Sequence, residues 1–253
     1  MLQHSTIREN NEIECVSKLL IGILHTHFNT HNLPPFINLH SHRRPQSDEE
    51  FVIRNAYHFM DEKKADALPY SVSAGIHPWQ LKEDFSLQLN QLRKLATCEN
   101  VIAIGECGLD RIKGPAIEIQ IEALYAQIEL ANRVSKPMIL HLVKSYSDIL
   151  AYAHLMKTSW IVHGFKGNSI EAENLLKKGA RLSFGPRLLT DETMQVLFTS
   201  IPLEFIYLET DTKRVLIDEM YQKAALLRNL EIDDLRTSIW LNFVRDFNSH
   251  ETR

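Results

Sequence analysis

The chain has 253 residues, of which 44% are apolar, and a formal net charge of −4. This length and apolar content can bury one sizeable core, and α/β barrels of about 250 residues normally form one domain. The slight excess of acids excludes a protein coated in positive charge for non-specific nucleic-acid binding, although it still permits a local basic rim. The three cysteines, Cys15, Cys98 and Cys107, have no CxxC spacing, which argues against a disulfide scaffold and favours a reducing cytoplasm. No apolar run reaches the roughly 20 residues needed to span a bilayer, so we expect no membrane partner.

Residues 1–35 stand apart from the rest of the sequence. Ile13–His27 has the spacing of one amphipathic helix, and Asn32–Pro35 reads as its exit turn. We therefore predict a helical N-terminal extension over residues 1–35 and a single barrel over residues 36–253.

Short apolar, β-branched runs then alternate with longer stretches of helical periodicity. The predicted strands are Phe36–His40, Tyr70–Ile76, Val101–Gly105, Pro137–Leu142, Trp160–His163, Ala180–Phe184 and Phe205–Leu208. The predicted helices are Asp48–Lys64, Phe85–Thr97, Ile117–Ser135, Ser145–Lys157, Ile170–Lys178, Asp191–Thr199, Val215–Arg228 and Asp233–Phe247. This alternation predicts βαβ units with a parallel sheet, and hence a TIM-type (β/α)8 barrel. Only seven strands are visible, so the eighth is either short and polar or the barrel closes irregularly after Asp211.

Ligand-capable side chains fall at the carboxyl ends of five predicted strands, where the working face of a parallel barrel lies. They are His40, His42, Glu106, His141, His163 and Asp211. His40 and His42 are two residues apart, so both imidazoles can face the barrel mouth. Two carboxylates buried without cationic partners would be costly, and a bound cation removes that cost. The sequence therefore predicts a metal site.

Four imidazoles and two carboxylates suit Zn, Mn, Fe or Mg. Six ligands exceed the need of one tetrahedral ion, which favours two divalent ions over one. Glu106 would bridge them, with the pair His40 and His42 on one ion and the pair His141 and His163 on the other. Such a pair generates hydroxide and stabilises a leaving oxygen. Asp211 is placed to accept the proton of the water.

Other side chains after the predicted strands are candidates for substrate contact. His77 and Trp79 follow the second predicted strand, and Trp79 either stacks on a base or sugar or covers the barrel rim. Basic residues in these loops form a candidate phosphate collar: Arg43, Arg44, Arg111, Lys113, Lys144, Lys166 and Arg187. Cys107 is expected to be a buried, inert thiol.

Six segments together resemble the TatD family of metal-dependent hydrolases, within the amidohydrolase-like barrels. They are Asn38–His42, Ala74–Trp79, Ala103–Asp110, Lys136–His141, Ile161–Gly167 and Leu208–Asp211. The resemblance implies a divalent-metal phosphodiesterase or deoxyribonuclease, commonly a 3′–5′ exonuclease on single-stranded DNA. Asn38 departs from the pattern, because the family commonly has Asp before the HxH pair.

Two other functions remain open from the residues themselves. The same metals would activate hydroxide against an acyl or amide bond, such as a lactone, an amidohydrolase substrate or the ester of a mis-charged tRNA. A non-catalytic nucleic-acid or metal-binding protein is the alternative from another class, and the completeness of the ligand set counts against it. No obligate protein partner is inferred.

Overall fold

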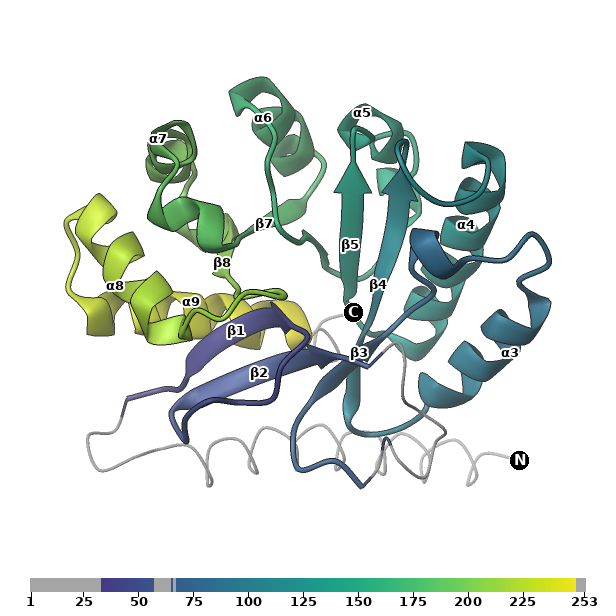
Figure 1. The fold of residues 1–253 in the computed structure, drawn as a ribbon, viewed down its shortest axis with the longest axis horizontal. Helices are drawn as coiled ribbons and strands as arrows, with labels where there is room; N and C mark the ends of the chain where they lie inside the picture. Colours follow the sequence, from purple (N-terminus) through teal and green to yellow (C-terminus); the bar gives the residue numbers. More distant parts are fainter. Residues whose placement is uncertain (1–32, 57–64, 66, 249–253) are drawn as a thin grey trace, which may run out of the picture.

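A computed structural model describes residues 33–56, 65 and 67–248 of the chain. Its strands are β1 Phe36–Ser41, β2 Glu50–Asn55, β3 Val72–Ala74, β4 Val101–Asp110, β5 Met138–Val143, β6 Trp160–Val162, β7 Ala180–Phe184 and β8 Ile206–Leu208. They form one sheet in the order β1 to β8, and each neighbouring pair is parallel. The sheet curls so that β8 returns to β1 (Figure 1). The predicted TIM-type barrel is confirmed.

The helices lie outside this sheet (Figure 1). The α-helices are α3 Ser86–Leu95, α4 Ile117–Val134, α5 Tyr146–Ile149, α6 Ser169–Lys177, α7 Glu192–Ser200, α8 Ile217–Arg228 and α9 Ile232–Phe247. The 3₁₀ turns are η1 Pro78–Gln80, η2 Ala153–Leu155, η3 Pro186–Leu189 and η4 Leu203–Phe205. Most agree with the predicted helices, but Ser145–Lys157 contains only the short α5 and η2. The predicted helix Ile13–His27 lies outside the described residues. No described helix is long and apolar enough to cross a membrane.

The strand missing from the sequence prediction is β2, and the predicted helix Asp48–Lys64 is wrong at its start. Acidic residues before Phe51 imitate a helix N-terminus, but Phe51, Val52 and Ile53 form a buried run of aromatic and β-branched residues in a strand that lies between two others. Parallel pairing with β1 and β3 decides the conformation. The eighth strand is therefore not a short, polar strand after Asp211, where no further strand is present among the described residues. The barrel does close irregularly there, through an isolated bridge between Ser41 and Asp211.

The barrel closes at its mouth by backbone pairing between β1 and the segment after β8. Asp211 N–H donates to His40 O and His42 N–H donates to Asp211 O, both at 3.0 Å. Below this bridge, side chains from α8 and α9 form hydrogen bonds with the backbone of β1 and β8. The Tyr221 hydroxyl lies 3.0 Å from Ile37 N and 3.1 Å from Ile37 O, and Asn242 Nδ2 donates to Ile206 O at 3.1 Å. The seam is thus closed by strand pairing only next to the predicted site.

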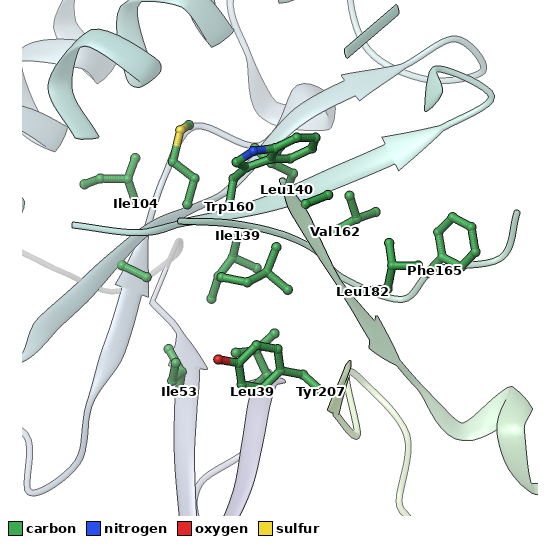
Figure 2. Packing of buried hydrophobic residues seen from close by; sticks show 14 of the residues in the cluster. Leu39, Ile53, Ile104, Ile139, Leu140, Trp160, Val162, Phe165, Leu182 and Tyr207 are labelled. Carbon is green, nitrogen blue, oxygen red and sulfur yellow. The ribbon is translucent and has the colours of Figure 1, made fainter. Parts of the chain in front are cut away.

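The barrel interior and the layer between sheet and helices form one apolar core. Figure 2 shows Leu39, Ile53, Ile139 and Tyr207, which come from four different strands, pointing toward one another. All four are completely buried. A close-packed interior of this kind leaves little freedom to the strand ends above it, so the side chains at the mouth are held on a rigid support.

Candidate metal centre

Glu106 lies at the centre of the site because of a β-bulge in β4. Gly105 pairs with Ile139 and Cys107 with Leu140, so Glu106 is an extra residue without a partner in β5. A bulge re-aims the side chain it carries. The strands approach so closely here that a Cβ on Gly108, whose φ is +145°, would lie 2.1 Å from His141 O. The prediction that Glu106 ends its strand is wrong, because β4 continues to Asp110 and Glu106 lies within it.

One oxygen of Glu106 faces the first pair of histidines. Glu106 Oε2 lies 3.4 Å from His40 Nε2 and 3.7 Å from His42 Nε2. The register between β1 and β2 shifts between Asn38 and Ser41, which places an extra residue beside His40. His40 is fully buried, whereas the His42 side chain is 38% exposed. This half of the cluster is therefore open toward solvent through His42.

The other oxygen faces the second pair. Glu106 Oε1 lies 2.8 Å from both His141 Nδ1 and His163 Nε2. The remaining nitrogen of each ring faces an acid: His141 Nε2 lies 3.2 Å from Asp110 Oδ2, and His163 Nδ1 lies 3.3 Å from Glu209 Oε1. A carboxylate behind an imidazole fixes the ring and its tautomer.

Asp211 completes the side that belongs to the first pair. Its Oδ1 lies 3.8 Å from His40 Nε2 and 3.6 Å from His42 Nε2. The residue has a left-handed backbone with φ of +50°, which the two hydrogen bonds of the barrel seam hold in place. The side chain is 33% exposed, so its carboxylate is accessible from the mouth.

The buried charges of the site stabilise one another. Burial opposes ionisation of Glu106, but the charge of His163 and hydrogen bonds from the surrounding imidazoles hold its pKa well below the usual value. Burial disfavours a charge on His163 as well, yet the carboxylates of Glu106 and Glu209 raise its pKa well above 6.5. Burial lowers the pKa of His77. The position of His163 between the carboxylates of Glu106 and Glu209 therefore favours the protonated ring in the metal-free protein.

The donor set fits a divalent cation. Neither ring nitrogen of His40 has a hydrogen-bond partner among the described residues, although Nε2 faces two carboxylates. His40, His42 and Glu106 each offer a ligand atom within 4.8 Å of the others. Imidazole and carboxylate ligands of this kind bind first-row divalent metals. The structure thus brings all six predicted ligands together in a cluster capable of binding metal.

The sequence analysis missed three polar residues that surround the ligands. Asn55 on β2 donates from Nδ2 to Glu106 Oε2 at 2.8 Å. Asp110 and Glu209 face the histidines as described above. Asn55 was hidden because its strand was predicted as a helix. Asp110 and Glu209 belong to the quoted motifs, and their positions, Asp110 four residues after Glu106 and Glu209 two before Asp211, were the available signal.

The predicted substrate contacts lie around the mouth in different environments. His77 is buried, and its Nε2 lies 3.0 Å from Glu106 Oε1. Trp79 is 48% exposed, donates from Nε1 to Asp110 Oδ2 at 2.6 Å, and lies under the ammonium of Lys113 at 3.8 Å. Lys144 and Lys166 are exposed.

The collar is partly neutralised. Arg111 makes two hydrogen bonds with the Asp148 carboxylate, at 2.6 and 2.8 Å, and Arg187 pairs with Asp191.

The predicted inert Cys107 is fully buried, and burial raises its pKa.

Comparison with known proteins identifies similar chains. A relative named "Uncharacterized metal-dependent hydrolase YjjV" from Escherichia coli K12 is 30% identical over 56% of this chain and 58% of its own length. One named "3'-5' ssDNA/RNA exonuclease TatD" from Erwinia billingiae is 34% identical over 62% of this chain and 63% of its own length. The chain thus matches less than two thirds of these relatives. The crystal structure of the TatD homologue YJJV from E. coli K12 has the same fold, with a TM-score of 0.74 at 22% identity over 84% of this chain and 98% of that one.

The sequence model of one family matches residues 60–248, which exceeds half of the chain. The match begins after β2, so His40, His42 and Asn55 lie outside it, although the structure places all three in the same cluster as the ligands inside it. The chain belongs to the TatD related DNase family.

Proposed function

We propose that this protein is a hydrolase of phosphodiester bonds that uses two divalent cations bridged by Glu106. The observation that carries the proposal is the division of the Glu106 carboxylate between two histidine pairs. Oε2 faces His40 and His42, whose Nε2 atoms also face Asp211, whereas Oε1 faces His141 and His163. One carboxylate shared in this way suits two ions better than one. The relatives named as metal-dependent hydrolases support the assignment as a metal-dependent hydrolase.

Bound divalent cations would supply a water of lowered pKa and would stabilise charge on the leaving oxygen. The protein residues divide the remaining work. Asp211 is the partly exposed carboxylate of the cluster, so it accepts the proton of the attacking water. Glu209 and Asp110 hold the rings of His163 and His141. The ions are Zn, Mg or Mn in this proposal.

The proposed substrate is single-stranded nucleic acid, with DNA cleaved from its 3′ end. Relatives are named as 3′–5′ exonucleases of single-stranded DNA and RNA. Trp79 offers an exposed indole beside His141, with ring centroids 5.6 Å apart, and an indole stacks on any base. Lys144 and Lys166 are exposed cations for phosphates.

The test combines metal loading with a substrate screen. The chain, freed of metal and reloaded with Zn²⁺, Mn²⁺ or Mg²⁺, is incubated with single-stranded DNA, RNA, bis(p-nitrophenyl) phosphate and lactones. Asp211→Asn is expected to abolish turnover while preserving the fold, and the exposed Asp234→Asn serves as its control. Turnover of Asp211→Asn at the wild-type rate would refute the assigned base. Hydrolysis of lactones without cleavage of phosphodiesters would refute the substrate class.

A further inference from the structure

The two oxygens of Glu106 each face a polar group that is not one of the six predicted ligands. Asn55 Nδ2 donates to Oε2 at 2.8 Å, and His77 Nε2 lies 3.0 Å from Oε1. Both side chains are buried. Asn55 comes from β2 and His77 from the segment after β3, so the two groups reach Glu106 from neighbouring strands.

The backbone determines which nitrogen of His77 carries the proton. Trp79 N–H donates to His77 Nδ1 at 3.0 Å, where His77 caps the η1 turn. A nitrogen that accepts this hydrogen bond has no proton of its own, so the proton of the neutral ring is on Nε2. The atom that faces Glu106 is therefore an N–H donor. Nε2 then has no lone pair with which to coordinate a cation.

We propose that Asn55 and His77 are positioning residues that clamp the bridging carboxylate of Glu106. Each donor occupies one lone pair of one oxygen, and the second lone pair of each oxygen stays directed at a histidine pair. The clamp fixes the plane of the carboxylate, so that Oε1 and Oε2 serve different cations instead of both turning toward one. This inference rests on the two-cation function proposed above.

The geometry distinguishes this role from two others for His77. A metal ligand needs an unprotonated nitrogen toward the cluster, and the Trp79 N–H prevents that tautomer. A substrate contact needs access from the mouth, but the His77 side chain is only 8% exposed and is packed between Trp79 and His141. Of these three roles, the position of His77 therefore suits only that of a donor to Glu106.

The experiment measures Mn²⁺ binding to the full chain after removal of metal, by calorimetry and by electron paramagnetic resonance. The wild type is expected to bind two Mn²⁺, and the second gives the spectrum of a spin-coupled pair. Asn55→Leu and His77→Phe remove the donors and are expected to weaken the second Mn²⁺ by about 10- to 100-fold, with loss of coupling. His77→Gln keeps an N–H near the position of Nε2 and is expected to retain the coupled pair. The exposed His154→Phe is the matched control.

Three results would overturn the clamp while leaving the proposed function in place. Unchanged Mn²⁺ affinity and coupling in both donor-less variants would show that the donors do nothing for the bridge. Equal weakening in His77→Gln and His77→Phe would make His77 a ligand. A ¹⁵N spectrum of the metal-free wild type with the proton of His77 on Nδ1, assigned by its loss in His77→Gln, would contradict the tautomer. A wild type that binds fewer than two Mn²⁺ would overturn the proposed function itself, and the clamp with it.

Discussion

A buried polar network joins the first strand to the segment that carries Asp211, and it makes a sharp prediction for Asn38→Asp. Asn38 Nδ2 donates to Glu50 Oε1 at 2.6 Å and to Thr210 Oγ1 at 2.9 Å, while Asn38 Oδ1 accepts from Thr210 N–H at 3.0 Å. Asn38 is 1% exposed and Glu50 5% exposed. The substitution replaces a donor with a second carboxylate at hydrogen-bond distance from the first.

The cost of this change follows from protonation. Two buried carboxylates in contact cannot both ionise, so one of them keeps a proton in the folded variant. An ordinary carboxyl titrates near 4, and each pH unit above that value costs about 1.4 kcal/mol, which gives about 4 kcal/mol at pH 7 and about 1 kcal/mol at pH 5. The pKa of the carboxyl that keeps the proton is higher in the folded variant than in the unfolded chain. The variant therefore keeps its full stability below the unfolded pKa, and its free energy of unfolding decreases as the pH rises.

Urea unfolding of wild type and variants at pH 5, 6 and 7 measures this cost. Asn38→Asp combined with Glu50→Gln is expected to recover most of the stability, because the new amide donates to Asp at position 38 while its oxygen accepts from Gln46 N–H, as Glu50 Oε2 does now. A loss of the same size at pH 5 and pH 7, or no recovery in the double variant, would refute the reasoning.

Three further predictions concern the metal cluster. Gly108→Ala should lower the free energy of unfolding by about 3 kcal/mol or more, because the Cβ of the alanine would collide with His141 O. Thermal unfolding measures this change, and a loss below about 1 kcal/mol would contradict the prediction. Glu209→Gln should weaken Mn²⁺ binding about 10-fold, because His163 Nδ1 loses its carboxylate; calorimetry that gives wild-type affinity would refute the role. Mn²⁺ affinity should rise with pH up to the raised pKa of His163, because the metal displaces the proton of that ring. Calorimetry in buffers of different ionisation enthalpy should detect the released proton. An affinity that does not depend on pH, with no proton release, would contradict this prediction.

The sequence by itself determined the fold class and the six candidate ligands. Buried parallel strands show as apolar runs between helical segments, and barrel geometry places their carboxyl ends on one face. His141 and His163 could therefore be assigned to one site from chain position alone. The TatD resemblance rested on motifs at the same strand ends, and the match of the family model confirmed it.

Only the tertiary structure decided what surrounds these ligands. β2 forms because it pairs with β1 and β3, and local propensity around Phe51 could not reveal those partners. The bulge that turns Glu106 inward depends on the register between β4 and β5. Asn55 and Glu209 meet the cluster across 51 and 46 residues of sequence. Such contacts are set by strand pairing between distant segments, which a pattern read along the chain does not contain.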